Sequence, residues 1–513
     1  MTRRNTASFR IFILTLYLFL IAVFASGCTD RIFNPPPTLS VPTSDSTIPP
    51  TGSIPPKPTE TPDSEQEIHF TDVHLESAVR DKLEKSIGVI RRADVNSIKK
   101  LDLRVQAITS IDSLEYFTSL EELDLYGNYI TDFSVLAKLP SLKKLNLARN
   151  YNLRNPDMTN SEGLDLSPLK SLVLLEELDL SENMLMDLSA IGSLPSLKTL
   201  TLKQNRITDI TPLSGCKALT YVDLSNNYGL NSDNTERGIT DLSPLFGNTH
   251  IRTLIASRNL ITNIDGIEAL EELSYLDLTD NYLDSVAPLA GVRKLETALL
   301  QSNAITSLEP LKENPTIKTL DVSMNMISNP GLTGIGTMSA LQTLKLSQNW
   351  ITDITPLTGS KSLIYVDLSY NYGKNADNTE RGIKDLSPLF ENQHLKTLIA
   401  NHNLITSIEG IEALIELTYL DLTDNYISSI GQLSGAGKLE TLLIRNNKIT
   451  MLEPLRGNAT LKTLDVSMNK IIDFDVIKTM TALQRLGWKE NPVQDIISID
   501  EFKTSPGIEI NNG

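Results

Sequence analysis

A unit of about 22 residues repeats along most of this 513-residue chain, and no other feature limits the possible folds as much. Seventeen units follow one another over residues 98–490, and most read L-x-x-L-x-L-x-x-N-x-I-x-x-I-x-x-L-x-x-L. The alternating L-x-L places both leucines on one face of a short strand. One unit cannot bury these leucines alone, whereas stacked units share a continuous core. The repeat therefore predicts a solenoid.

An asparagine ends the predicted strand in sixteen of the seventeen units, from Asn128 to Asn491, and Gln106 takes this position in the first unit. Its amide can satisfy backbone groups where the chain turns away from the strand. The segments that follow often carry a proline, such as Pro212, which fits a short 3₁₀ turn better than a long helix. Because such turns form a slim outer layer, we expect an open arc with a parallel sheet on its concave side.

The unit resembles the leucine-rich repeat, specifically the 22-residue class of the bacterial internalins. LTYLDLTDNYISSIGQLSGAG, residues 417–437, is a representative copy, and the resemblance covers residues 98–490. It implies an α/β solenoid with a concave parallel sheet and a convex side of 3₁₀ turns and loops. Internalin-like repeats bind other macromolecules, so the resemblance also implies a protein partner.

A larger duplication is superimposed on the repeat. Residues 197–340 and 341–482 are copies of one six-unit block, in which Asn205 matches Asn349 and Asp233 matches Asp377. Each copy contains an insert that ends in DNTERG. Its acidic and amide oxygens could bind Ca²⁺, but they lack the regular spacing of a dedicated calcium loop. We therefore expect a solvated bulge.

The N-terminus has the features of an export signal. Three arginines precede an apolar run, residues 11–24, which is shorter than the roughly 20 residues needed to cross a bilayer. Small residues then lead to Cys28. This junction resembles a bacterial lipobox, although Ala25 replaces the usual leucine, and the resemblance implies that residues 1–27 are a lipoprotein signal peptide and that Cys28 is lipidated. Secretion without a lipid is the alternative.

The regions that flank the repeats have different compositions. Residues 28–65 are rich in Pro, Ser and Thr and predict a disordered linker. Residues 66–97 predict a helical N-terminal cap, with Thr71 or Asp72 as the N-cap and Gly88 as the stop. This segment resembles the cap that precedes many bacterial leucine-rich repeats. Residues 491–513 are expected to form a C-terminal cap or tail.

Composition excludes several classes of function. The net charge of −17 argues against nucleic acid as a partner, because phosphate binding needs clustered Lys and Arg. Two cysteines exclude a disulfide framework, and five scattered histidines exclude a His/Cys metal site. The chain has no Gly-rich phosphate loop, H-E-x-x-H, C-x-x-C or nucleophile-elbow motif. We therefore expect no enzyme activity, no cofactor and no metal.

The position between the two core leucines predicts a binding surface. From the unit at Leu175 onward, aspartate alternates there with other residues. Neighbouring carboxylates are therefore two strands apart, about twice the strand spacing of about 4.8 Å, which weakens their repulsion. Aliphatic residues stand between the aspartates, and tyrosines stand two residues before four of them. Because aromatic residues commonly anchor interfaces, the predicted partner-binding residues are Tyr221, Asp223, Ile255, Tyr275, Asp277, Leu299, Tyr365, Asp367, Ile399, Tyr419, Asp421 and Leu443. Passive spread of Leu-Asp-Leu by duplication is the competing interpretation.

Together these features predict a monomer that is anchored by lipid to a bacterial membrane, on the extracytoplasmic side or at the cell surface. The predicted partner is an extracellular or cell-envelope protein, bound for adhesion or scaffolding. The alternative is a cell-wall or glycan-binding module whose tyrosines stack on sugars.

Overall fold

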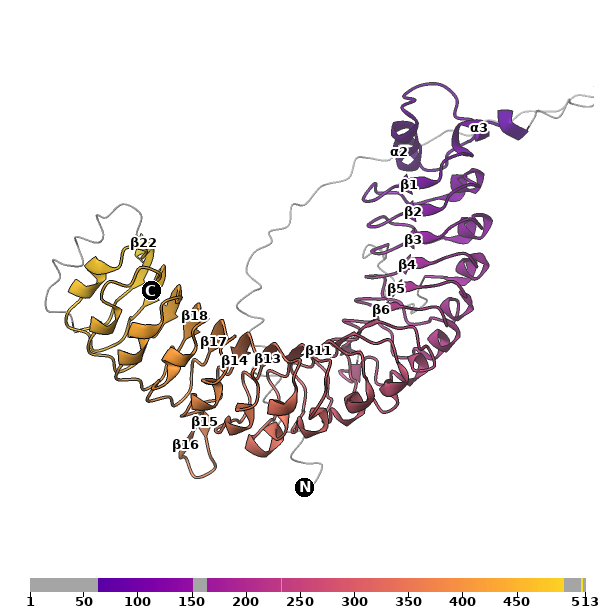
Figure 1. The fold of residues 1–513 in the computed structure, drawn as a ribbon. Coiled ribbons are helices and arrows are strands. Elements are labelled where there is room, and N and C mark those ends of the chain that lie inside the picture. The colour runs from indigo at the N-terminus through magenta and orange to yellow at the C-terminus, as the bar shows by residue number, and fades with distance from the viewer. Residues whose placement is uncertain (1–62, 151–163, 232, 493–508, 511–513) are drawn as a thin grey trace, which may run out of the picture. The chain divides into compact units, whose positions relative to one another are not determined.

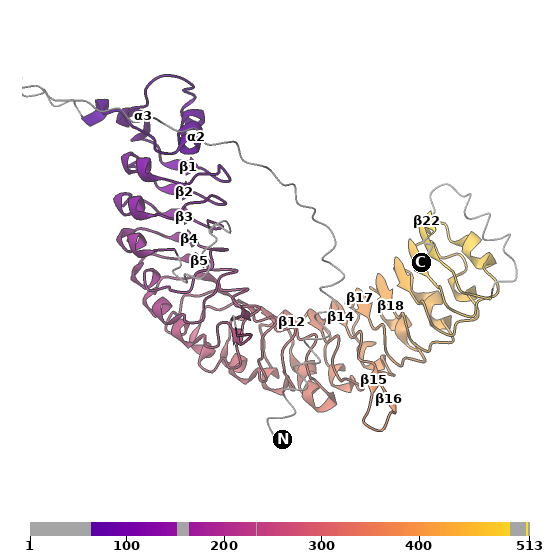
Figure 2. The ribbon, with the colours of Figure 1, turned by 180° about the vertical axis from the view of Figure 1, so that it is seen from behind.

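The computed structural model describes residues 63–150, 164–231, 233–492 and the backbone of 509–510. The predicted signal peptide, Cys28 and residues 28–62 of the predicted linker lie outside these residues, as do residues 493–508 and 511–513 of the predicted tail. The last three residues predicted as disordered linker form a 3₁₀ turn, Asp63–Glu65. Each repeat contributes one short strand to a single parallel sheet. The strands line the concave side of the repeat stack, and the 3₁₀ turns lie on its outer side (Figure 1 and Figure 2).

The sheet has 18 strands, and those of consecutive repeats pair in parallel without a change of register. Leu101 pairs with Leu123, which pairs with Leu145, and the same position repeats along the sheet. The strands are β1 Lys100–Asp102, β2 Glu122–Asp124, β3 Lys144–Asn146, β4 Glu177–Asp179, β5 Thr199–Thr201, β6 Tyr221–Asp223, β9 Thr253–Ile255, β10 Tyr275–Asp277, β11 Thr297–Leu299, β12 Thr319–Asp321, β13 Thr343–Lys345, β14 Tyr365–Asp367, β17 Thr397–Ile399, β18 Tyr419–Asp421, β19 Thr441–Leu443, β20 Thr463–Asp465, β21 Arg485–Gly487 and β22 Glu509–Ile510.

The outer side consists of 3₁₀ turns, and Pro212 lies in the first turn of one of them, as expected for a residue without an N–H. The turns of the repeats are η2 Asp112–Tyr116, η3 Ser134–Lys138, η4 Ser167–Ser171, η5 Ile191–Ser193, η6 Thr211–Gly215, η7 Ser243–Leu245, η8 Ile267–Ala269, η9 Ala287–Gly291, η10 Glu309–Leu311, η11 Asn329–Leu332, η12 Ile335–Thr337, η13 Thr355–Leu357, η14 Ser387–Leu389, η15 Ile411–Ala413, η16 Gly431–Gly435, η17 Glu453–Leu455 and η18 Asp475–Thr479; η1 Asp63–Glu65 precedes the N-terminal cap. Between the sheet and the turns, repeat leucines such as Leu178 and Leu180 are buried in one continuous core. Each contributes about 1.5–3 kcal/mol through burial. The predicted solenoid fold is confirmed.

The asparagine at the end of each strand joins neighbouring repeats. Asn205 donates from Nδ2 to the carbonyls of Leu180 and Leu202, both at 3.0 Å. Its Oδ1 accepts from the backbone N–H groups of Asn183 and Leu185, also at 3.0 Å. The amide therefore satisfies backbone groups of two repeats at once, in the place where the strand pairing ends.

The residue before this asparagine has a positive φ in every repeat, a feature that the sequence did not reveal. The angles range from 51° to 70°, and glycine occupies the position only at Gly127. The other residues are Val105, Arg149, Glu182, Gln204, Asn226, Arg258, Asp280, Ser302, Met324, Gln348, Tyr370, His402, Asp424, Asn446, Met468 and Glu490. The left-handed conformation costs about 1–2 kcal/mol for a residue with a Cβ. The asparagine hydrogen bonds and the leucine core hold the backbone there.

Helix α2, Val73–Leu83, covers the first repeat, and the short helix α3, Arg92–Val95, follows it. Asp72 is the N-cap of α2, and its Oδ1 accepts from the N–H groups of His74 and Leu75. The prediction that the helix stops at Gly88 is wrong. The helix ends at Leu83, because Glu84 adopts a left-handed conformation with φ 53° and its N–H bonds back to carbonyls of the last turn. Of the helices in the described residues, none is long and apolar enough to cross a membrane.

The duplicated inserts form two short antiparallel hairpins, which the sequence predicted only as bulges. In the first block β7, Gly229–Leu230, pairs with β8, Glu236–Arg237, and in the second β15, Gly373–Lys374, pairs with β16, Glu380–Arg381. The hairpin acids bond locally: Asp377 Oδ1 accepts from the N–H and the hydroxyl of Thr379. Within the described residues, no group of three or more His, Cys, Asp or Glu could hold a metal ion.

Candidate binding surface

The first and third residues of each strand form the open face of the sheet. In β10, for example, the central Leu276 is buried, whereas Tyr275 and Asp277 on either side of it are half-buried. The same alternation recurs in most strands, since successive side chains point to opposite faces. Two rows of side chains therefore run along the concave side. The first row contains the first residue of each strand, and the third row contains the third residue.

The first row consists of threonines and tyrosines from β5 to β20. Thr253 pairs with Tyr221 on one side and with Tyr275 on the other, and Thr397 lies in the same way between Tyr365 and Tyr419. The two tyrosines of each pair are thus two strands apart, about 10 Å. Burial, followed by the charge of Asp223, raises the pKa of Tyr221. The phenol is therefore neutral and able to donate a hydrogen bond.

The third row contains the predicted aspartates, and the structure gives them a role that sequence reasoning missed. Oδ1 of Asp277 accepts from the N–H of Thr279 at 2.9 Å, and Asp367 accepts from Ser369 in the same way. The equivalent bonds to Asp223 and Asp421 are also 2.9 Å. One oxygen of each carboxylate therefore accepts a hydrogen bond from the backbone where the strand ends.

All twelve predicted partner-binding residues belong to the first or third positions of the strands on this face, but Asp223 and Asp421 are buried there, whereas the other ten are partly exposed. Along the third row, Asp223, Ile255, Asp277 and Leu299 occupy successive paired positions, so each aliphatic side chain stands beside aspartates. Ile399 and Leu443 stand beside Asp421 in the second block, where Ile399 also pairs with Asp367. Their contact with a partner stays a prediction.

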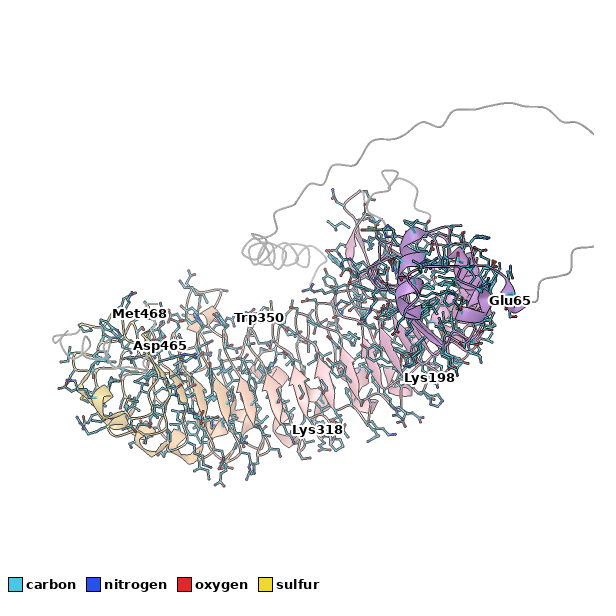
Figure 3. All side chains as sticks on the ribbon, turned by 90° about the horizontal axis from the view of Figure 1, so that it is seen from above. Glu65, Lys198, Lys318, Trp350, Asp465 and Met468 are labelled. Carbon is cyan, nitrogen blue, oxygen red and sulfur yellow. The ribbon has the colours of Figure 1, made fainter. Side chains whose placement is uncertain are left out.

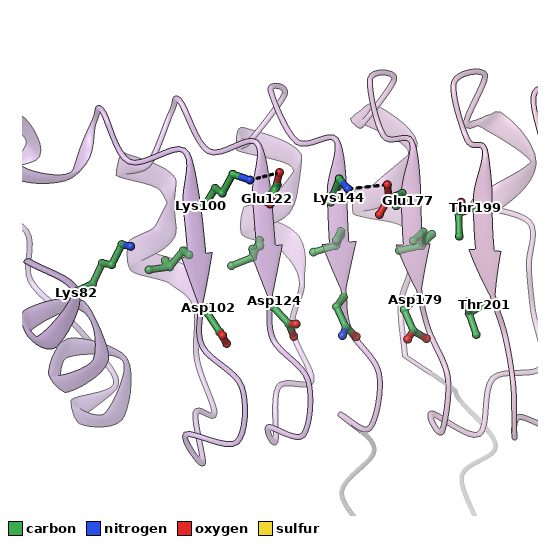
Figure 4. A pocket seen from close by; sticks show the side chains of 15 residues that line it. Lys82, Lys100, Asp102, Glu122, Asp124, Lys144, Glu177, Asp179, Thr199 and Thr201 are labelled. Carbon is green, nitrogen blue, oxygen red and sulfur yellow. Dashed lines mark ion pairs between the residues drawn. The ribbon is translucent and has the colours of Figure 1, made fainter. Parts of the chain in front are cut away.

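The same face is charged at its N-terminal end, where it forms a shallow depression (Figure 4). Here the first row holds Lys100, Glu122, Lys144 and Glu177 in place of threonine and tyrosine, and Lys82 of α2 borders it. Lys100 bonds to Glu122 and Lys144 to Glu177, both at 2.7 Å. Exposed pairs of this kind contribute little to stability. The charges of the first row are therefore paired with one another, while the third row adds the carboxylates of Asp102, Asp124 and Asp179.

A second group of side chains lies where the strands of the second block end. We define the aromatic edge as Trp350, Tyr370, Tyr372 and Tyr426. The first three rings are 43%, 48% and 41% exposed. Figure 3 places Trp350 and Met468 along one long edge of the sheet, and Lys198 and Lys318 along the opposite edge. Sequence reasoning missed this group.

The signal that could have found the aromatic edge is a comparison of the two copies. Trp350, Tyr370 and His402 stand where the first block has Arg206, Asn226 and Arg258. The other two rings, Tyr372 and Tyr426, match Tyr228 and Tyr282 of the first block, so Trp350 and Tyr370 are the rings that the second block adds. The repeat pattern itself carries no such signal, because they lie at variable positions.

Comparison with known proteins agrees with this geometry. The family model "Leucine Rich repeats (2 copies)" matches residues 96–138, 118–160, 173–215, 195–247 and 393–435, and "Leucine Rich repeat" matches residues 313–336 and 457–473. The chain has the leucine-rich repeat fold. A search of the curated proteins finds no match.

Several solved structures share the leucine-rich repeat fold. A leucine-rich repeat protein of Leptospira interrogans is 22% identical, with 82% of this chain and 97% of that chain covered and a TM-score of 0.65. The functional domain of InlJ from Listeria monocytogenes is 20% identical, with 80% and 83% covered and a TM-score of 0.50. The plant peptide hormone receptor RGFR1, in complex with RGF2, is 21% identical, with 75% and 61% covered and a TM-score of 0.58. The fold is thus shared with bacterial proteins and with a receptor.

Proposed function

We propose that the concave face of this leucine-rich repeat protein binds another protein. The observation that carries this proposal is the pair of rows on the open sheet, where half-exposed tyrosines and aliphatic side chains lie in register across neighbouring strands. Tyrosine combines a large apolar ring with a hydrogen-bonding hydroxyl, which suits a protein interface. The structure of RGFR1 with RGF2 gives a precedent for a partner on this fold. The function is binding, and catalysis is not part of the proposal.

The proposal includes a location. The basic start, the apolar run and the small residues before Cys28 support export and lipidation, which would place the repeats outside the cytoplasmic membrane of a bacterium. The Pro-rich residues 28–65 would then act as a spacer. A net charge of −17 favours a partner with basic and apolar patches. Adhesion and scaffolding are the two roles that fit such a molecule.

The binding face is tested by crosslinking on intact cells with the full-length protein as bait. Tyr221, Tyr275, Tyr365 and Tyr419 are each changed to Thr, the residue that the neighbouring strands carry in the same row. The partner captured by the native protein should be reduced at least tenfold. A matched control changes the exposed Ile415 and Met451, which lie outside the sheet, to Thr and should leave capture unchanged. Equal capture by the tyrosine variant and the native protein would refute the proposed face.

The anchor is tested by Cys28→Ala. The native protein should incorporate a radiolabelled fatty acid and fractionate with membranes, and the variant should do neither. Membrane retention of the variant, together with no labelling of the native protein, would show that secretion occurs without a lipid.

A further inference from the structure

Each ring of the aromatic edge is held in place by a polar neighbour. The guanidinium carbon of Arg381 lies 5.8 Å from the centre of the Trp350 ring, and Nζ of Lys448 lies 4.5 Å from that of Tyr426. Tyr372 donates from its hydroxyl to Glu380 at 3.0 Å. These contacts fix the rings in the free protein, so little side-chain entropy would be lost when a ligand covers them.

Tyr370 is held by a stack rather than by a charge. Its ring lies 4.1 Å from the ring of His402, with an angle of 22° between the two planes. Nε2 of His402 is 2.9 Å from a carboxylate oxygen of Asp424, which holds the imidazole in the next repeat. Tyr370 is still 48% exposed, although its left-handed backbone conformation is costly for a bulky residue. A large aromatic ring thus lies exposed to solvent at a position where it does not pack in the hydrophobic core.

The first block shows that the fold does not require the rings of Trp350 and Tyr370. With the same repeats and the same hairpin, it carries Arg206, Asn226 and Arg258 at the three equivalent positions. Arg258 there pairs with Asp280, the counterpart of Asp424. The first block keeps tyrosines, Tyr228 and Tyr282, at the positions of Tyr372 and Tyr426. The second block therefore adds two rings that a copy of itself folds without, which points to a ligand rather than to stability.

The neighbours of the rings indicate which ligand. The side chains that contact the rings or His402 include four charged groups: Arg381, Glu380, Lys448 and Asp424. The core of a protein–protein interface is depleted of charged residues, since desolvating them is costly. A sugar avoids this cost, because its C–H face covers a ring while its hydroxyls bond to the charged groups at the rim. These charges offset one another, so a neutral sugar fits better than an anionic one.

The arrangement of the rings points to a polymer. Trp350 and Tyr372 lie at the same position of adjacent repeats, and Tyr426 lies there two repeats after Tyr372. Along the stack these repeats advance about 4.8 Å each, so Tyr372 and Tyr426 are about 10 Å apart. An extended β-1,4-linked glycan repeats over a similar length every two sugar rings. A linear glycan can therefore place its sugars in register with the rings of the row, whereas a folded protein surface lacks such a regular spacing.

We propose that the aromatic edge is a second binding site, separate from the concave face, for a neutral β-1,4-linked glycan chain. The rings of Trp350, Tyr372 and Tyr426 stack on sugars along the row, and Tyr370 adds a ring in the repeat of Tyr372. Glu380 and Arg381 of the hairpin bond to hydroxyls. This site does not depend on the proposed protein-binding function.

The test titrates cellohexaose and chitohexaose into the detergent-solubilised full-length protein by calorimetry and by tryptophan fluorescence. At least one oligosaccharide should bind and change the emission. The triple variant Trp350→Arg, Tyr370→Asn and His402→Arg carries the residues of the first block, so it should keep its fold, checked by thermal unfolding. Its affinity should fall at least tenfold.

The control changes Tyr221 and Tyr275 to Thr on the concave face and should leave sugar affinity unchanged. Three outcomes overturn the proposal. Neither oligosaccharide binds the native protein, or the folded triple variant binds as tightly as the native protein, or the concave variant is the one that loses the sugar. Loss of a crosslinked protein from the triple variant, without any sugar binding by the native chain, would make the aromatic edge part of a protein interface.

Discussion

The two duplicated blocks, residues 197–340 and 341–482, have the same backbone conformation at matched positions but different side chains where their strands end. Gly266 and Gly410 have φ angles of 95° and 93°, and Asn226 and Tyr370 have angles of 57° and 55°. The ladder asparagines also agree position by position, and most core positions hold a buried apolar residue in both blocks. At the ends of the strands, by contrast, the first block has Arg206, Asn226 and Arg258 where the second has Trp350, Tyr370 and His402.

The difference separates the positions that the fold constrains from those that it leaves free to vary. A core leucine contacts the neighbouring repeats, so its replacement costs stability in both. A side chain at the strand end leaves the stack, and the backbone there keeps its conformation for residues as different as Asn and Tyr. The edge could therefore change between the two copies while the core stayed the same.

The largest effect should come from breaking the asparagine ladder in either block. Asn205→Ala leaves two N–H groups without their acceptor, those of Asn183 and Leu185, and Asn349→Ala leaves one, that of Ile327. The carbonyls that these amides reach keep a second donor from a neighbouring ladder asparagine. At about 1–3 kcal/mol for each buried group left unsatisfied, we expect losses of about 4 and 2 kcal/mol. Urea unfolding measures both.

The matched control for the ladder is the hairpin pair Asn231→Ala and Asn375→Ala. These exposed amides each bond to one threonine hydroxyl, so their loss should cost less than about 1 kcal/mol. Equal losses for the ladder and hairpin variants would contradict the role assigned to the ladder.

The N-terminal cap, which is present once, gives the next effect and serves as a reference outside both blocks. Burial alone would raise the pKa of Asp72, but N–H groups of Thr109 and Leu75 donate to the carboxylate and lower the pKa to about 2 from 3.8. The carboxylate therefore contributes about 2 kcal/mol above pH 3.8, and this is lost as pH falls through 2. The stability gap between native protein and Asp72→Ala should shrink by about half at pH 3. Hydrogen exchange of α2 measures the gap, and a pH-independent gap would contradict the sign.

A smaller effect should separate the blocks at their matched glycines. At Gly266 an added Cβ would lie 3.2 Å from Cδ2 of Phe246, whereas at Gly410 it would lie 2.8 Å from Cδ2 of Phe390. Both glycines have a positive φ, so alanine costs about 1 kcal/mol in backbone energy at either site. Gly410→Ala should cost more, about 2 kcal/mol, because its Cβ contact is too short. Thermal unfolding of the two variants decides, and a larger loss at Gly266 would contradict this reading of the contacts.

Much of the fold could be predicted from the sequence because the repeat supplies the same constraint seventeen times. The strand leucines, the 3₁₀ prolines and the role of Asn205 all follow from periodicity and from the need to bury or bond each group. The end of α2 could not be predicted, since it depends on Glu84 taking a left-handed conformation, which a side chain with a Cβ disfavours.

The binding surface could be predicted only where it follows the repeat. Tyr275 and Asp277 occupy regular strand positions, so their common face was visible in the pattern. The strand-ending hydrogen bond of Asp277 was not, because it depends on the chain turning two residues later. Trp350 and Tyr370 lie at variable positions, and only a comparison of the two copies singles them out.

The smallest effect exchanges one edge residue between the blocks. Burial and then the charge of Arg206 lower the pKa of Arg237, whereas burial alone lowers that of its counterpart Arg381, which lies over Trp350. Arg206→Trp should therefore stabilise the first block by about 0.5–1 kcal/mol, since it replaces a like-charge contact with a cation–π contact. Trp350→Arg should destabilise the second block by a similar amount. Both sites are partly exposed, so salt at 1 M should reduce the electrostatic part of each change. Changes of the same sign in the two blocks would show that these arginines and the tryptophan act through something other than their charge and ring.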